Sequence, residues 1–397
     1  MRLAARAEKI SPSPTLSIDA QAKKMIAAGE KVINFSAGEP DFDTPEHIKQ
    51  AAIEALQKGM TKYTPVDGTP ALKEAIRKKF NEENGLDYKP EQIVVSCGAK
   101  HSLYNAIQVI CEPGDEIILP APYWVSYLEQ IKMAGGQPVI PQTRVKNGFK
   151  LTVGELESVV SPRTRMIILN SPSNPTGAVY TREEISALGE VLLRRGIIII
   201  SDEIYEKFIY DGLEHVSIAS LAPGLKELTI VINGVSKAYA MTGWRIGYAA
   251  APTPLARAMA NLQSHSTSNP TSIAQEASIA ALTGTRAPLF QMVAEFNRRR
   301  DYMLECLLDI PGISCPRPGG SFYLFPSIER FIGRAYKGKH IDSASELAAI
   351  LLAEAKVAVV PGVAFGDDKC FRLSYATAME DIREGLDRIG EILIAVK

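Results

Sequence analysis

Residues 181–205 read TREEISALGEVLLRRGIIIISDEIY, and this stretch decides the fold. Thr181, followed three residues later by Glu184, forms a capping box that predicts the start of a helix. The apolar run at 197–200 is typical of a central strand that is buried on both faces. A helix that leads directly into such a strand is the repeating unit of an α/β sheet.

Short β-branched runs alternate with helical patterns on both sides of this stretch. Thr69 and Pro70 open another predicted helix, because proline suits the first helical position. The alternation predicts a mainly parallel sheet covered by helices. We expect its strands at Ile93–Ser96, Glu116–Leu119, Arg165–Leu169, Gly196–Ile200, Leu228–Ile232 and Ile246–Ala250.

The two ends of the chain have a different pattern. Residues 1–45 are rich in proline and serine, and the pattern after about residue 290 is a helix, short strands and a closing helix. A chain of 397 residues is long for one domain. We therefore expect a large α/β domain at 46–290 and a smaller α+β domain built from 1–45 and 291–397.

Composition excludes several classes of function. The net charge of −1 gives no reason to expect nucleic acid as a partner. No apolar run approaches the roughly 20 residues of a membrane span, and the start MRLAARAEKI lacks the apolar stretch of a secretory signal. The five cysteines form no CxxC pair, which favours reduced thiols and a cytoplasmic location. The five scattered histidines show no ligand spacing, so we expect no metal site.

Residues able to bind a ligand follow several of the predicted strands. Ligand sites in open α/β sheets lie outside the carboxyl ends of the strands, so we expect these residues to share one pocket. Gly98-Ala99-Lys100 opens a helix whose free N–H groups suit a phosphate, and Trp124 can stack on a flat ring. Asp202 needs a cation or an N–H donor if it is buried. Taken singly, each has an ordinary alternative. Gly98-Ala99-Lys100 could be a plain strand–helix turn, Trp124 could pack in the core, and Asp202 could cap a helix.

Residues 232–251, INGVSKAYAMTGWRIGYAAA, place Lys237 and Arg245 among small and apolar residues with no carboxylate nearby in sequence. We expect both to be buried, and buried unpaired charge is costly, so a bound group should compensate them. An aldehyde would suit the lysine and a phosphate the arginine. A lysine in a dry pocket loses its proton more easily and becomes nucleophilic. An acid, an aromatic stacker, a phosphate cradle and an amine are together the groups that pyridoxal phosphate needs.

The segment GVSKAYAMTGWRIG (234–247) carries the lysine signature of the class I aminotransferases. Residues 1–397 also resemble the bacterial aspartate aminotransferases of the subgroup found in Thermus, rhizobia and cyanobacteria. The supporting segments are SAGEPDFDTPEHIK, TKYTPVDGTPALKEAI, PAPYWVSY, NSPSNPTGAVY, SDEIYE and FRLSYAT. The resemblance implies the PLP-dependent transferase fold type I, in agreement with the predicted sheet.

The resemblance also implies a role for each matching residue. Lys237 resembles the lysine that forms the Schiff base with pyridoxal 5'-phosphate, and Asp202 the carboxylate that keeps the pyridine nitrogen protonated. Asn174 and Tyr205 resemble the pair that contacts the phenolic oxygen of the ring, and Trp124 the residue stacked on it. Lys237, Asp202 and Tyr205 are therefore the expected catalytic residues.

The phosphate and the neighbouring subunit are assigned in the same way. Arg245 and the backbone amides of Gly98, Ala99 and Lys100 match the phosphate cradle. Tyr63 matches a tyrosine that reaches the phosphate of the neighbouring subunit, which implies a homodimer.

The implied reaction is reversible transfer of the amino group between L-aspartate and 2-oxoglutarate. Arg372 resembles the arginine that clamps the substrate α-carboxylate, and Lys100 with Ser13 and Thr15 takes the part of the distal-carboxylate site. The expected substrate-binding residues are Gly38, Trp124, Asn174, Arg372, Lys100, Ser13 and Thr15.

Two positions depart from related patterns. Other branches have a serine three residues before the lysine, where this chain has Gly234, and compensation by Ser236 is left open. Relatives that aminate prephenate carry a lysine in the N-terminal arm where this chain has Ser11, so that activity is disfavoured as a side reaction.

Three other functions compete with this interpretation. A carbon–sulfur β-lyase would share the fold and the cofactor. A cofactor-binding regulator would carry a DNA-binding module before the fold, and only about thirty residues precede FSAGEPDF. A nicotinamide-dependent dehydrogenase is disfavoured because no GxGxxG follows a predicted strand.

Overall fold

The computed structural model describes residues 3, 4, 8 and 10–397, so residues 1–2, 5–7 and 9 of the predicted N-terminal segment lie outside the described residues. Within the described part, seven strands form one sheet in the order β2-β8-β7-β6-β5-β3-β4. They are β2 (Ile93–Ser96), β3 (Glu116–Ile118), β4 (Gln137–Val139), β5 (Thr164–Asn170), β6 (Ile198–Asp202), β7 (Thr229–Gly234) and β8 (Gly247–Ala250). Strand β8 is antiparallel to both neighbours and the other pairs are parallel, which confirms the mainly parallel sheet.

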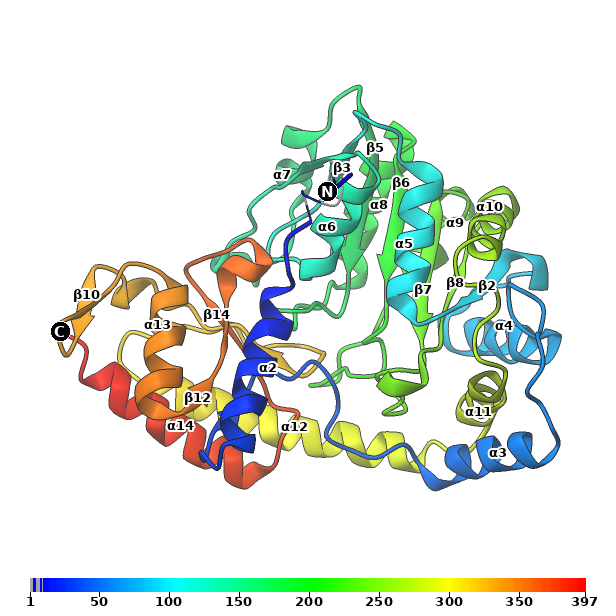
Figure 1. Ribbon diagram of the computed structural model, residues 1–397. Helices are drawn as coiled ribbons and strands as arrows, with labels where there is room; N and C mark the ends of the chain where they lie inside the picture. Colours follow the sequence, from blue (N-terminus) through cyan, green and yellow to red (C-terminus); the bar gives the residue numbers. More distant parts are fainter. Residues whose placement is uncertain (1–2, 5–7, 9) are drawn as a thin grey trace.

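Helices cover both faces of this sheet (Figure 1). One face carries α5 (Ala99–Ile110), α6 (Val125–Met133) and α10 (Thr253–Ser264), and the other carries α7 (Val153–Val159), α8 (Arg182–Arg195) and α9 (Pro223–Lys226). Successive strand side chains point to opposite faces. Ile199 of β6 therefore packs in the cluster with α8, whereas Ile200 packs in the cluster with α5. This alternation explains why the strand is apolar at consecutive positions.

The predicted helix starts are confirmed. Thr181 caps α8: its Oγ1 accepts from the N–H of Glu184 at 3.3 Å, and its own N–H donates to the Glu184 carboxylate at 2.8 Å. Thr69 Oγ1 likewise accepts from the N–H of Leu72 at 3.3 Å at the start of α4 (Pro70–Asn84). The capping residues identified in the sequence thus fix the first residues of α4 and α8.

One predicted strand needs correction, and one strand was missed. Gly196 does not begin a strand; it ends α8 with φ +63°, and β6 runs on to Asp202. Strand β4 was not predicted, because it is short, contains Pro138 and pairs on one side only, at the edge of the sheet.

The remaining elements lie beside the large sheet. Strand β1 (Ile33–Asn34) pairs in parallel with β12 (Val357–Ala358). The other short strands are β9 (Tyr323–Leu324), β13 (Val360–Pro361) and β14 (Phe371–Ser374) in one sheet, and β10 (Arg334–Tyr336) with β11 (Lys339–Ile341) in a hairpin. The remaining helices are α2 (Pro14–Ala27), α3 (Glu46–Gln57), α11 (Ser272–Thr283), α12 (Ala287–Leu308), α13 (Ala344–Ile350) and α14 (Met379–Ile394).

We propose the division into 46–290 and 1–45 with 291–397 on the basis of these pairings. The β1–β12 ladder joins the N-terminal segment to the last part of the chain, and α12 packs along α14 (Figure 1). Residue 290 lies inside α12, so this helix would connect the two parts.

The five cysteines, which all lie within the described residues, are free thiols. Among the helices described, none has both the length and the apolar character required to cross a bilayer.

Candidate active site

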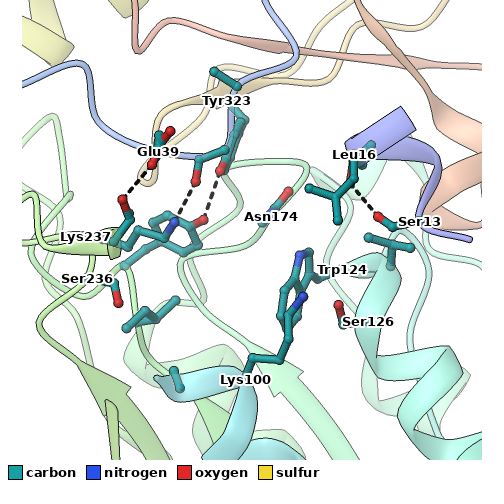
Figure 2. A pocket seen from close by; sticks show the side chains of 18 of the residues that line it. Ser13, Leu16, Glu39, Lys100, Trp124, Ser126, Asn174, Ser236, Lys237 and Tyr323 are labelled. Atoms are coloured by element: carbon teal, nitrogen blue, oxygen red, sulfur yellow. Dashed lines mark hydrogen bonds between the residues drawn. The ribbon is translucent and has the colours of Figure 1, made fainter. Parts of the chain in front are cut away.

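A cavity of about 530 Å³ lies at the carboxyl ends of β5 and β6 (Figure 2). All the predicted site residues except Gly98 and Tyr63 line it: Ser13, Thr15, Gly38, Ala99, Lys100, Trp124, Asn174, Asp202, Tyr205, Lys237, Arg245 and Arg372. Gly98 directly precedes the lining residue Ala99, whereas Tyr63 is 91% exposed. The structure thus gathers at one place residues that are far apart in sequence.

Lys237 follows β7 and points into this cavity (Figure 2). Its ammonium donates a 2.6 Å hydrogen bond to the backbone oxygen of Gly38. Burial lowers the pKa of Lys237 to about 8, and the positive charges of Arg372 and Arg245 add to the effect, whereas the Glu39 carboxylate opposes it. The amine is therefore much easier to deprotonate than an ordinary lysine.

Asp202 is the last residue of β6 and is buried against the cavity. Its carboxylate accepts from the hydroxyl of Tyr127 at 2.7 Å and from the N–H of Ile204 at 3.2 Å. Burial raises the pKa of Asp202 to about 6, against the effect of these two donors and of Lys237. A positively charged ring nitrogen would satisfy this buried carboxylate.

Tyr127 was not predicted as a site residue. It lies on the first turn of α6, three residues after Trp124, and the two rings meet edge to face with centroids 5.3 Å apart. Residues three apart share a helix face, so this spacing was a signal available in the sequence.

The N-terminus of α5 and Arg245 form a cradle beside the lysine. Gly98 has φ +86° at the helix start, and an added Cβ there would collide with the Arg245 guanidinium. Arg245 donates to the backbone oxygens of Thr242 at 2.9 Å and Cys97 at 3.3 Å. The first-turn N–H groups of a helix have no intrahelical acceptor, so with the guanidinium they suit a phosphate.

The expectation that Lys237 and Arg245 are both buried is only partly right. Arg245 is exposed, and Lys237 is half-buried with Glu39 among the residues of the same cavity. Glu39 also accepts from the hydroxyl of Thr242 at 2.6 Å. The nearby acid comes from a segment about two hundred residues away in sequence, which local sequence could not indicate.

Gly234 has a packing reason for lacking a side chain. A Cβ at this position would lie 3.0 Å from the Cα of Gly247, 3.1 Å from the oxygen of Ile246 and 3.2 Å from Ile204. Strands β7 and β8 are paired there, so a serine would fit only if these neighbouring atoms moved by a few tenths of an ångström. Ser236, in contrast, lines the cavity.

Arg372 lies on β14 at the other wall of the cavity. Its guanidinium donates to the Asn174 side-chain oxygen at 3.0 Å and to the Ser36 backbone oxygen at 2.7 Å. Its Nε is buried and has no hydrogen-bond partner among the described residues. A buried guanidinium with free donor capacity beside a cavity is suited to a substrate carboxylate.

Lys100 and helix α2 form a further part of the wall (Figure 2). The Lys100 ammonium lies 4.9 Å from the ring centroid of Trp124. Burial lowers the pKa of Lys100, and the charge of Arg245 adds to this. The hydroxyls of Ser13 and Thr15 are 3.0 Å apart at the start of α2. Besides Lys237, Arg245 and Arg372, the cavity therefore holds the cation of Lys100 and two hydroxyls from the N-terminal segment.

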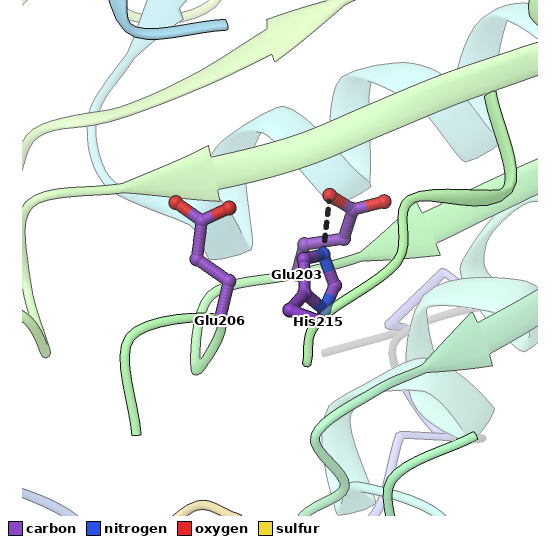
Figure 3. A group of neighbouring side chains, drawn as sticks. All are labelled: Glu203, Glu206 and His215. Atoms are coloured by element: carbon purple, nitrogen blue, oxygen red, sulfur yellow. Dashed lines mark hydrogen bonds and ion pairs between the residues drawn. The ribbon is translucent and has the colours of Figure 1, made fainter. Parts of the chain in front are cut away.

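A second cluster of ionisable side chains lies outside this cavity (Figure 3). It comprises Glu203, Glu206 and His215, whose potential ligand atoms lie within 4.8 Å of one another. Glu203 accepts from His215 at 3.0 Å, and Lys79 forms an ion pair with Glu206. Burial alone would raise the pKa of Glu206, but the ammonium groups of Lys79 and Lys207 outweigh it and hold this pKa well below its usual range. Because the two carboxylates already have partners, we interpret the cluster as a buried ion network.

The fold and the site define a transferase that depends on pyridoxal phosphate. The chain belongs to the family described as aminotransferase class I and II, whose model matches residues 30–389. It is 52% identical over 395 residues to an aspartate aminotransferase of Geobacillus stearothermophilus, covering 100% of both chains. Among solved structures, the aspartate aminotransferase of Rhizobium meliloti superposes with a TM-score of 0.97 at 47% identity, covering 100% of both chains.

A structure from Thermus thermophilus adds a bound ligand to these comparisons. It is described as aspartate aminotransferase with maleate, and it matches with a TM-score of 0.93 at 42% identity, covering 99% of this chain and 100% of the other. These likenesses confirm the resemblance to aminotransferases and the type I fold drawn from the sequence.

Proposed function

We propose that the chain transfers the amino group reversibly between L-aspartate and 2-oxoglutarate. The observation that carries this proposal is that Arg372 and Lys100 line the same cavity as Lys237. A substrate with two carboxylates needs two cations or sets of donors when it leaves water. The naming of the relatives and the maleate in the Thermus structure, a dicarboxylate, support this choice.

The residues present fit pyridoxal phosphate. Lys237 supplies the amine for the aldehyde, and Asp202 supplies a buried carboxylate for the ring nitrogen. The α5 N-terminus with Arg245 supplies a phosphate cradle in which a side chain at Gly98 would not fit. Trp124, Asn174 and Tyr205 come from the same cavity walls and would hold the ring; the roles of all these residues are our proposals.

The bound cofactor would supply an electron sink for the carbanion that forms at the substrate Cα. Arg372 would grip the α-carboxylate and so fix the direction of the Cα–H bond. Lys237 would then take the proton from the substrate Cα and return a proton to the carbon that comes from the cofactor aldehyde, on the other side of the amino nitrogen. A pKa of about 8 suits this work, because a proton carrier is most effective when its pKa lies near the working pH. Burial of Asp202 would keep bulk water away from the ring nitrogen.

We also propose a homodimer in which Tyr63 reaches the phosphate of the neighbouring site. Tyr63 is 91% exposed and does not line the cavity of its own chain. Ile53 and Leu56 of the nearby helix α3 are also exposed, at 44% and 53%. Large exposed apolar side chains near one another are typical of an interaction surface. The cytoplasmic location expected from the reduced thiols stays a prediction.

A panel of amino donors against 2-oxoglutarate tests the function, with kcat/KM as the readout. We expect aspartate to rank first, and prephenate as an acceptor to be much poorer than 2-oxoglutarate. Another donor ranking first would overturn the substrate proposal. Release of pyruvate from cysteine sulfinate without any amino acceptor would instead favour the β-lyase alternative.

A further inference from the structure

Tyr323 lies between Tyr205 and Arg372 in the wall of the cavity. It is on β9, opposite Ser374 of β14, and its side chain lines the cavity (Figure 2). The same β14 strand carries Arg372 two residues earlier. The backbone pairing therefore fixes the position of Tyr323 relative to the proposed substrate arginine.

The hydroxyl of Tyr323 contacts the proposed cofactor residue Tyr205. The two hydroxyl oxygens are 2.9 Å apart, and the two rings meet at 81° with centroids 5.8 Å apart. Both side chains are buried, so neither hydroxyl is freely hydrated. Either hydroxyl can be the donor in this pair; when Tyr323 donates, the proton of Tyr205 is left free to point toward the cavity. Donation along such a chain also strengthens the next hydrogen bond, by roughly 10–30%.

The ring of Tyr323 contacts Arg372. The guanidinium carbon lies 4.5 Å from the Tyr323 ring centroid and 5.1 Å from that of Phe365. A guanidinium that stacks on aromatic faces is held in one plane while its N–H edges stay available. The edges of Arg372 contact Asn174 and Ser36, and its Nε remains for another acceptor.

We propose that Tyr323 is a positioning residue: its hydroxyl orients the hydroxyl of Tyr205 toward the cofactor, and its ring orients Arg372 toward the substrate α-carboxylate. A phenylalanine would pack equally well as a core residue and would serve only the second purpose. The hydroxyl and the ring thus make separable contributions. The inference rests on the proposed cofactor role of Tyr205 and the proposed substrate role of Arg372.

The test compares Tyr323→Phe, Tyr323→Leu and the control Tyr375→Phe, each loaded with pyridoxal phosphate. Tyr375 is also buried, but its hydroxyl donates to the backbone oxygen of Ser321 at 3.1 Å. One readout is the pH midpoint of the visible absorption band, and the other is the dissociation constant of maleate. Thermal melts of the three variants check that they are folded.

For Tyr323→Phe we expect the spectral midpoint to rise by about half a pH unit or more, because Tyr205 donates more weakly to the cofactor, while maleate affinity changes less than about threefold. For Tyr323→Leu we expect the same spectral shift and about tenfold weaker maleate binding. Tyr375→Phe should change neither readout.

A Tyr323→Phe midpoint equal to that of the wild type would overturn the role of the hydroxyl. Equal maleate binding by the Leu and Phe variants would overturn the role of the ring. A wild-type protein with no visible band in the presence of pyridoxal phosphate would contradict the proposed function itself, which separates the two failures.

Discussion

The hydroxyl of Tyr127 donates a 2.7 Å hydrogen bond to the carboxylate of Asp202, and both side chains are buried. Burial favours the neutral acid at position 202, with a pKa raised to about 6, whereas the Tyr127 hydroxyl favours the charged form. The tyrosine therefore helps to keep Asp202 charged at neutral pH, as a partner of a protonated ring nitrogen must be.

Tyr127→Phe should weaken pyridoxal phosphate binding by about tenfold or more, since hydrogen bonds to charged groups contribute about 1.5–3 kcal/mol. The pKa of Asp202 should rise further, so the acidic limb of the kcat/KM profile should move to higher pH. Equilibrium dialysis and the pH profile measure the two effects. Tyr336→Phe, at a buried tyrosine on β10 that does not line the cavity, serves as the control. An unchanged affinity would show that Tyr127 does not support Asp202.

Lys237→Ala should change how the stability of the cofactor-free protein depends on pH. The Lys237 pKa is about 8 in the folded chain and near the ordinary 10.5 when unfolded, so the unfolded chain binds more protons between these values. The wild type therefore gains stability as pH rises through this window, whereas Lys237→Ala lacks this gain. Chemical unfolding of both proteins at pH 7 and pH 10 measures the difference. Parallel pH dependence of the two proteins would contradict the depressed pKa.

Gly234→Ser tests the packing between β7 and β8. The added side chain meets atoms 3.0–3.2 Å from its Cβ, two of them in the backbone of β8 or the residue before it, so a loss of about 1–3 kcal/mol is expected. The melting temperature of the cofactor-free protein measures this. Gly243→Ser is the control, because nothing lies within 4 Å of its added Cβ and the residue is exposed. Equal melting temperatures would mean that the strands can separate to admit the serine.

Lys100→Met should discriminate between substrates. If Lys100 binds the distal carboxylate, kcat/KM for aspartate falls about tenfold or more, whereas that for alanine, which lacks this group, changes much less. Lys146→Met, at an exposed lysine that does not line the cavity, should affect neither substrate. A loss that is equal for aspartate and alanine would instead assign Lys100 to the cofactor or to packing.

Hybrid dimers test the position of Tyr63. Tyr63→Ala and Lys237→Ala subunits should each be poorly active alone. Refolding them together should restore activity, because one site of each hybrid then has an intact lysine and an intact tyrosine from the other subunit. Activity of the mixture that equals the mean of the two separate variants would contradict the shared site.

The large sheet was predictable because its information is local. Each signal depends on residues close together in sequence: the four isoleucines at 197–200, the capping box of Thr181 and Glu184, and the strand–helix turn that Gly98 opens. Tyr127, on α6, was missed although its spacing from Trp124 was a local signal, whereas Tyr323 and Glu39 reach the cavity from outside the large sheet. Tyr323 comes from a two-residue strand, which has no periodicity to detect. Glu39, the acid near Lys237, comes from a turn in the N-terminal segment, and only the folded chain brings it there.

The hydrogen bond from Arg372 to the backbone oxygen of Ser36 joins residues that are 336 positions apart. During synthesis, Ser36 leaves the ribosome long before Arg372 is translated, whereas all the strands of the large sheet are already made by residue 250. Because domains fold as units while the chain emerges, we expect a nascent chain to assemble the proposed phosphate cradle and Lys237 before the proposed substrate arginine, Arg372, is made. We therefore expect nascent chains halted before residue 372 to bind pyridoxal phosphate but not to select an amino acid.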